Sequence, residues 1–251
     1  MADNQAVFLA RVRAALGREP GQKADGGGAR FSRDADELQA LLERGERTRA
    51  ERLALLEVLR DAAGPLKLHV HEAADMHAAG EAVAAIAREA EPEWGADRRV
   101  VVHDTPLLAG LGLAGRLEGE PVSVDVAAYR PGEAEAEARL RLRREAAEAT
   151  VGVTEAAWCA ADCAAVALFS GPGRPRSTSL TPSVHVAVLE LERLLADLPE
   201  LYSRLEAEEA AEGLPTAVAL VSGPSKTADI EGQLVHGAHG PRGMHLVVLT
   251  G

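Results

Sequence analysis

The chain has 251 residues, of which 47% are hydrophobic and only 3% aromatic, and its formal net charge is −12. A chain of this length can bury a substantial core, and here that core must consist mainly of Ala, Val and Leu. Such a composition favours an α/β protein over an all-β sandwich. The negative charge argues against nucleic acid and anionic lipid as partners, because it repels their phosphate groups.

Targeting signals and cysteine content further limit what kind of protein this can be. The first residues lack the basic start and apolar run of a signal peptide, and no apolar run approaches the roughly 18 residues of a membrane span. We therefore predict a cytoplasmic protein with no membrane span. The two cysteines, Cys159 and Cys163, are too few for the usual ligand set of an iron–sulfur cluster or a Cys-rich zinc site. Their setting among alanines predicts small buried side chains.

The N-terminal quarter has a helical pattern. Apolar residues at helical spacing predict a helix over residues 3–16, and the Gly-rich stretch that follows predicts a linker at 17–32. Leucines between residues 34 and 62 continue the pattern, with Gly45 as a break between two helices. We assign residues 1–63 to an N-terminal helical arm and residues 64–251 to an α/β domain.

After residue 64, short apolar runs alternate with periodic segments rich in Ala and Glu, which is typical of βαβ units. Right-handed crossovers predict one mostly parallel sheet with helices on both faces. The predicted strands are 66–70, 100–102, 122–126, 164–169, 184–189, 217–221 and 245–249, and the predicted helices are 74–89, 106–114, 133–149 and 197–211.

Three loops near strand ends combine Gly and Pro with polar side chains: residues 170–174, 222–226 and 237–241. Ligands of parallel sheets usually bind at the carboxyl ends of strands, so we expect these loops to face one another across one pocket. Small residues let the backbone approach a phosphate or carboxylate, and Arg174 or Lys226 can add a positive charge. An ordinary strand-ending turn is the alternative interpretation of each loop.

Familiar catalytic motifs are absent. Lys226 lacks the preceding glycine of a nucleotide P-loop, and no serine lies in the nucleophile-elbow pattern of the α/β-hydrolases. The glycine fingerprint of dinucleotide-binding proteins does not follow the first predicted strand either. The sequence therefore argues against an NTPase, a hydrolase of that fold and a dinucleotide-dependent enzyme.

A small set of titratable residues lies in the last loops. His236 and His239 follow Asp229 and Glu231, a set that can bind a metal ion or perform acid–base chemistry, although histidines that hold a tight turn are the favoured explanation of the spacing. We predict no metal site. The candidate catalytic residues are Glu231 and His239, and the candidate ligand-binding residues are Ser170, Gly171, Arg174, Ser222, Gly223, Ser225, Lys226, Thr227, Asp229, His236 and Gly240.

Several short motifs occur together in a recognisable order: residues 152–154, 161–162, 168–173, 182–185, 222–231 and 237–241. In this order they resemble the lactate-utilisation protein C family, which carries a LUD domain. The resemblance implies a Rossmann-like sheet of the sugar-isomerase and coenzyme A transferase type. It also implies a role beside two iron–sulfur partner proteins in the oxidation of L-lactate to pyruvate, with the clusters in those partners and no cofactor bound by this chain.

Two positions depart from the family's usual pattern. Relatives usually have Asp-Thr-Gly followed by Thr or Ser where this chain has Asp162-Cys-Ala-Ala, so hydroxyl groups and a glycine are missing from that loop. Lys226 stands where Arg is common, which keeps the charge but gives up bidentate hydrogen bonding.

The leading hypothesis is an accessory subunit of an iron–sulfur-dependent system that oxidises L-lactate. The alternative is a stand-alone enzyme or binding protein for a small carboxylate or phosphate metabolite, with Glu231 or His239 as the acid–base group and Lys226 holding the anion. A third possibility is a scaffold whose N-terminal arm docks partner proteins.

Overall fold

The computed structural model describes residues 2–15, 34–92, 97–212, 215–230, 233–237 and 239–251. The chain divides into two compact units, Met1–Ala40 and Leu41–Gly251. The first unit contains α1 (Ala2–Ala15), which agrees with the helix predicted at 3–16, and the first part of α2 (Ala35–Arg44). The predicted linker at 17–32 lies outside the described residues.

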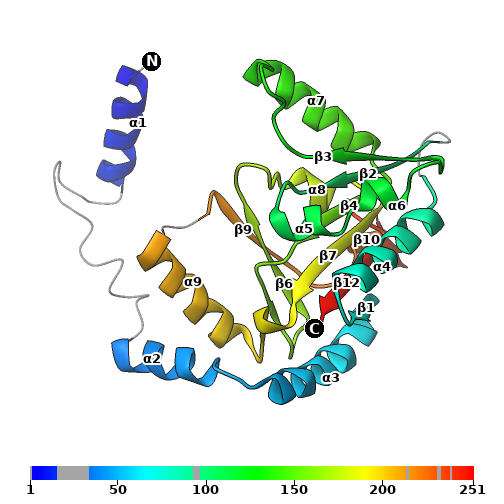
Figure 1. Ribbon diagram of the computed structural model, residues 1–251. Helices are drawn as coiled ribbons and strands as arrows, with labels where there is room; N and C mark the ends of the chain where they lie inside the picture. The colour runs from blue at the N-terminus through cyan, green and yellow to red at the C-terminus, as the bar shows by residue number, and fades with distance from the viewer. Residues whose placement is uncertain (1, 16–33, 93–96, 213–214, 231–232, 238) are drawn as a thin grey trace. The chain divides into compact units, whose positions relative to one another are not determined.

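A six-stranded parallel sheet forms the centre of the second unit, in the order β1-β12-β7-β4-β2-β3 (Figure 1). Its strands are rich in Val and Leu because both of their faces are covered. The predicted Rossmann-like, mostly parallel sheet is thus confirmed. The strands are β1 (Leu68–Ala73), β2 (Arg98–Val102), β3 (Val122–Val126), β4 (Val151–Glu155), β7 (Val184–Glu190) and β12 (Gly243–Leu249).

Three helices cover one face of this sheet: α4 (Met76–Glu89), α5 (Pro106–Gly110) and α6 (Leu113–Arg116). Val83 of α4 packs in one cluster with Val100 and Val153 of the strands. Both longer helices begin at side chains that accept backbone N–H groups. The Asp75 carboxylate accepts from Ala78 N–H at 2.7 Å, and Thr105 caps α5 ahead of a proline in its first turn.

The other face is covered by α3 (Arg49–Leu66), α7 (Glu135–Glu148) and α8 (Ser177–Leu180). Leu56 and Leu59 of α3 are fully buried beside Leu246 of β12. Figure 1 shows α3 near β1 at one edge of the sheet and α7 near β3 at the other. Since α3 contributes to the core of the second unit, removal of residues 1–63 would expose that core. The division into an arm and a domain at residue 63 stays a prediction.

A second, four-stranded sheet has the order β8-β5-β6-β9. β6 pairs antiparallel with both β5 and β9, so the prediction that segments 164–169 and 217–221 join the main sheet is wrong. The turn between β5 and β6 is too short for the crossover that a parallel pair needs. The elements are β5 (Trp158–Ala160), β6 (Ala165–Ser170), η1 (Leu191–Arg193), β8 (Leu194–Leu195), α9 (Leu198–Glu212) and β9 (Ala217–Val221).

A two-stranded hairpin, β10 (Lys226–Ile230) and β11 (Gln233–His236), completes the described elements. Within the described ranges, no helix is both long enough and apolar enough to cross a membrane.

A buried carboxylate connects α9 to the segment between α2 and α3. Glu200 accepts hydrogen bonds from the Arg47 guanidinium at 2.6 and 2.8 Å and from Ala196 N–H at 2.8 Å, and Arg44 Nε lies 2.7 Å away. Burial by itself would raise the pKa of Glu200, but the hydrogen bonds from Arg47 and Ala196 together hold it below its usual value.

Removal of this carboxylate should destabilise the second unit. We expect Glu200→Ala to lower the free energy of unfolding by about 3 kcal/mol at pH 7, because Arg47 loses its partner. Urea unfolding followed by circular dichroism measures this. Because the folded pKa is lowered, the contribution of Glu200 is present above pH ~4.3 and is lost as the pH falls through the folded pKa.

The matched control is Glu46→Ala, which removes an exposed carboxylate 3.2 Å from Arg204. It should cost at most about 1 kcal/mol. Equal unfolding midpoints for the two variants would show that the buried pair does not stabilise the fold.

Candidate functional site

The strand order of the main sheet reverses at β2, since β3 lies on one side of β2 and β4 on the other. In open α/β sheets, ligands tend to bind beyond the carboxyl ends of strands at such a point. His103 and Asp104 follow β2 directly, and Ala127 follows β3. The N–H of Ala127 donates to the carbonyl of Val102 at 2.8 Å, which holds the two strand ends together.

The loop that follows β6 lies against this strand end. Asp104 N–H donates to the carbonyl of Gly173 at 2.8 Å. Gly173 has φ of 71°, and a Cβ atom at this position would lie 3.0 Å from the Asp104 carbonyl oxygen. Glycine is required here both for the backbone conformation and for the close approach.

A cavity of about 770 Å³ lies between this loop and α7, and we call it the α7 cavity. Its walls come from the ends of β2 and β3, from α7 and from the loop after β6. The lining residues are Asp104, Ala127, Ala128, Tyr129, Arg139, Leu142, Arg143, Gly171, Pro172, Gly173, Pro175 and Ser177. A smaller cavity of about 200 Å³, lined partly by α5 and α6, shares Asp104 with it.

Beneath α8, buried polar side chains lie on the sheet. Thr154 Oγ1 and His185 Nε2 are 2.9 Å apart, and His103 Nε2 is 3.3 Å from the carbonyl oxygen of Pro175. The backbone of α8 approaches β4 so closely that a Cβ on Gly152 would lie 1.8 Å from the Thr178 carbonyl oxygen. Among the described residues, His103 Nδ1 and Thr178 Oγ1 find no hydrogen-bond partner. Such buried atoms usually bond to protein or to ordered water, so this layer is suited to water or a polar ligand group.

Two of the three predicted loops lie side by side. Ser225 N–H donates to the carbonyl of Pro241 at 2.8 Å, and Gly237 N–H donates to the carbonyl of Ser225 at 2.9 Å. A Cβ on Gly240 would lie 3.4 Å from Ser225 Cβ, whereas His239 is exposed. Loops 222–226 and 237–241 therefore lie in direct contact, and their role as a site stays a prediction.

The third loop lies elsewhere. In the antiparallel pair of β6 and β9, Ser170 is opposite Ala217 and Val221 is opposite Val166. Loop 170–174 and loop 222–226 thus leave the second sheet at opposite ends. The expectation that all three loops face one pocket is wrong, because it assumed parallel strands whose carboxyl ends share an edge.

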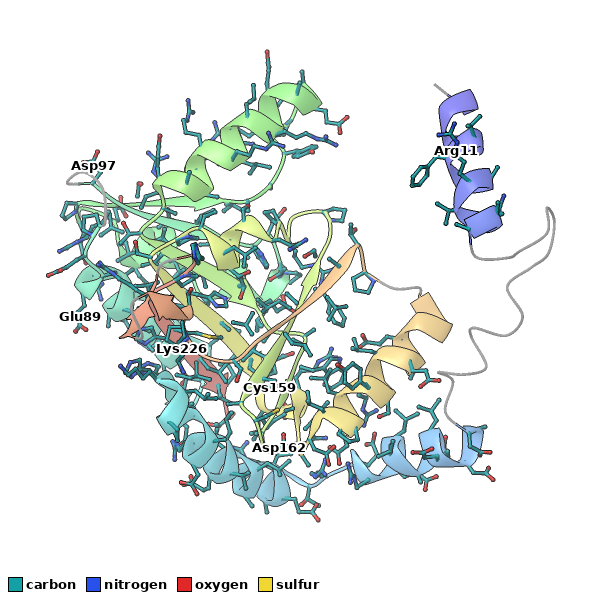
Figure 2. The ribbon with its side chains drawn as sticks, turned by 180° about the vertical axis from the view of Figure 1, so that it is seen from behind. Arg11, Glu89, Asp97, Cys159, Asp162 and Lys226 are labelled. Atoms are coloured by element: carbon teal, nitrogen blue, oxygen red, sulfur yellow. The ribbon has the colours of Figure 1, made fainter. Side chains whose placement is uncertain are left out.

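The other predicted residues divide into two groups. Ser222 Oγ donates to the carbonyl of Cys163 at 2.8 Å, Gly223 has φ of 81°, and the exposed Lys226 begins the hairpin (Figure 2). Gly171 lines the α7 cavity, and Arg174 lies in the same loop. The side chains of Thr227, Asp229 and His236, and all of Glu231, lie outside the described residues. Within the described part, no group of three or more metal-binding side chains is present.

Cys159 lies in β5 of the second sheet, and Cys163 lies in the turn between β5 and β6. Figure 2 shows Cys159 among the ribbons of that sheet, where it is fully buried, and Cys163 is partly buried. Burial, followed by the neighbouring Asp162, raises the pKa of Cys163 to about 11. Burial also raises the pKa of Cys159. Both groups are therefore neutral thiols at pH 7. The prediction of small buried side chains is confirmed for Cys159, whereas Cys163 is only partly buried.

Apart from Gly171 and its loop, the residues that line the α7 cavity were missed by sequence reasoning. No functional role was assigned to Arg139, Arg143 or Asp104 from the sequence. One signal was available, because Asp104 closely follows a strand predicted at 100–102, at the edge where ligands bind.

The buried histidines should make the fold sensitive to acid. Burial lowers the pKa of His103 to about 4 and that of His185 to about 3. Unfolded histidines titrate near pH 6.5, so the unfolded state binds more protons below that pH and the folded state loses stability as the pH falls. Each histidine should cost about 2 kcal/mol at pH 5.

Unfolding midpoints in urea between pH 7.5 and pH 5 test this. His185→Gln keeps a hydrogen-bonding group beside Thr154 but cannot titrate, so its stability should fall less steeply with pH than that of the unmodified chain. Identical pH slopes for the two proteins would contradict the assignment of a neutral, buried His185.

Comparison with known proteins places the chain in a family. A family model described as the LUD domain matches residues 56–249. Lactate utilization protein C of Halalkalibacterium halodurans is 35% identical over 153 residues, which cover 60% of this chain and 63% of that protein. Uncharacterized protein YkgG of Escherichia coli is 32% identical over 154 residues, again covering 63% of that protein. The matched region thus spans less than two thirds of these relatives' own length.

A solved structure supports the fold. The crystal structure of a DUF162 family protein from Deinococcus radiodurans aligns with a TM-score of 0.52 and 22% identity, over 81% of this chain and 99% of that one. At this identity the likeness concerns the fold alone. Because the family model covers most of the sequence, including every strand of both sheets, this chain belongs to the LUD domain family.

Proposed function

We propose that this chain is a component of a lactate-utilisation system. The observation that carries the proposal is the 35% identity, over 153 residues, to a protein named Lactate utilization protein C. A second protein of that name, from Shouchella clausii, is 37% identical over 93 residues. The motifs at residues 222–231 and 237–241, which first indicated the resemblance, include the two loops that lie side by side.

In this proposal the chain is an accessory subunit without a redox centre. Oxidation of L-lactate to pyruvate releases two electrons and two protons, and the electrons need an acceptor. Cluster ligands are thiolates, usually more than two, whereas this chain has two cysteines that are buried or partly buried as neutral thiols. The clusters that accept the electrons therefore belong to iron–sulfur partner subunits, and this chain binds no cofactor of its own.

Deletion of the gene tests the role. We expect the deletion strain to lose growth on L-lactate and to grow normally on pyruvate, because only the oxidation step is missing. Growth curves on the two carbon sources measure this, with a plasmid-borne copy of the gene as the control. Normal growth of the deletion strain on L-lactate would refute the role.

The accessory part of the proposal has its own test. A tagged chain purified from lactate-grown cells should carry proteins that contain iron and acid-labile sulfide, identified by mass spectrometry and metal analysis. Recovery of the chain alone, with no iron, would refute the partnership while leaving the growth phenotype intact.

A second candidate function is a stand-alone enzyme or binding protein for a small carboxylate or phosphate. It is favoured by the exposed Lys226, which stands at the junction of two loops held together by backbone hydrogen bonds. In this case Lys226 holds the anion, and His239 or Glu231 supplies the acid–base group.

Calorimetric titration of the purified chain with L-lactate, pyruvate and phosphate separates the two functions. The second candidate requires saturable binding that weakens at least about tenfold in Lys226→Ala and is retained in Lys226→Arg, which keeps the charge. No binding of any of the three anions would leave the accessory role as the better explanation.

A further inference from the structure

The α7 cavity has a positive lining in a chain that is strongly negative overall. Arg139 and Arg143 line it, Asp104 is its one lining carboxylate among the described residues, and Arg174 lies in the adjoining loop. The formal net charge of the whole chain is −12. The negative charge of the whole chain repels anions, whereas the arginines at this cavity attract them. The local positive charge therefore favours an anionic ligand in the cavity.

The arginines of α7 divide between two sides of the helix. Arg141 is buried and forms ion pairs with Glu133 at 2.7 Å and with Glu145 at 2.8 Å. The carboxylates on that side of the helix are therefore already paired with Arg141. Arg139 and Arg143 are one turn apart and share the side that faces the cavity, together with Leu142.

The cationic groups at the cavity are incompletely neutralised. Arg139 pairs with Glu135 at 2.6 Å, an exposed contact on the helix surface. The guanidinium of Arg143 forms no hydrogen bond or ion pair with a described residue, and the same holds for the guanidinium of the half-buried residue Arg174. A guanidinium without a carboxylate partner beside a cavity can bind a carboxylate, phosphate or sulfonate in a bidentate manner.

Much of the remaining wall is apolar. Ala127, Ala128 and Leu142 form one part of it, and Pro172 and Pro175 form another. Tyr129, whose side chain is 55% exposed, stands at the rim. An apolar wall with a few charged groups at one place is the usual character of a site for an organic molecule with one polar end.

The volume excludes a very small ligand as a good fit. At ~30 Å³ per water molecule, about 770 Å³ is the space of roughly 25 waters, and pockets for drug-sized molecules have about 300–1,000 Å³. A molecule as small as lactate or phosphate would leave most of the apolar wall in contact with water.

From these features we infer that the α7 cavity binds an amphipathic organic anion. Its acidic head group lies against Arg143 and Arg139, and its apolar body lies against Leu142 and the two prolines. This site is distinct from the paired loops 222–226 and 237–241, and it does not depend on the role in lactate utilisation.

A matched pair of fluorescent probes tests the inference on the full chain. Anilinonaphthalene sulfonate has an apolar body with a sulfonate group, and N-phenylnaphthylamine is its uncharged counterpart. We expect saturable fluorescence enhancement with the sulfonate and much weaker binding of the neutral probe. Arg143→Ala should reduce the affinity for the sulfonate about tenfold, the usual effect of losing a charged hydrogen bond.

Two further variants make the test specific to the cavity. Arg144→Ala removes the same charge from the neighbouring position of α7, which does not line the cavity, and should change the affinity less than about twofold. Gly171→Leu should block binding by filling space. A Cβ atom at Gly171 would meet only Arg174 Nη2, at 3.8 Å, so the added side chain has room in the fold.

Two results would refute this inference. Equal binding of the two probes would refute the anionic head group, and unchanged sulfonate binding in both Arg143→Ala and Gly171→Leu would refute the cavity as the site. Urea midpoints of all variants verify that they are folded. If Gly171→Leu fails to fold, the comparison of Arg143→Ala with Arg144→Ala still decides the matter.

Discussion

The contact between the end of β2 and the loop after β6 is the constraint on which the rest of the candidate site depends. β2 belongs to the main sheet and β6 to the second sheet, and the hydrogen bond from Asp104 N–H to the Gly173 carbonyl joins them. Gly173 permits this approach because no Cβ atom stands between the two backbones. With the loop fixed there, α7 forms the opposite wall and a cavity is left between them.

The arginines of α7 have different roles around this cavity. Arg141 forms ion pairs with Glu133 and Glu145 on one side of α7. Arg139 and Arg143 line the cavity on the other side. The buried layer under α8 is polar but uncharged. Burial keeps its histidines neutral, and they form hydrogen bonds with Thr154 and with the Pro175 carbonyl. The two arrangements adjoin at His103 and Asp104, so an acid-induced change in the layer would reach the cavity wall directly.

The paired loops and the α7 cavity suit different ligands. The loops present small residues and the exposed Lys226, a combination that suits a small anion or a partner surface. The cavity has a volume of about 770 Å³, apolar walls and arginines. Under the proposed function, the first region would bind the small acid or a partner subunit, and the second would bind a larger organic anion.

Local sequence patterns determined much of this protein. The periodic segments predicted the longer helices and most of the strands, but not the short helix α8, because amphipathic spacing is a property of neighbouring residues. Gly45 and the leucines on either side of it predicted two helices, and α2 and α3 are separated there. The ordered motifs of residues 152–241 indicated the family, and the family model confirms it.

Tertiary structure alone decided which strands pair and which loops meet. The short turn before β6 makes that strand antiparallel, and its Ala164 has φ of 48°, with its methyl group buried in the core. This turn sends the two Ser-Gly-Pro loops to opposite ends of the second sheet. Pairing and cavities arise from contacts between residues far apart in the chain, and neither hydrophobic periodicity nor motif spacing reports such contacts.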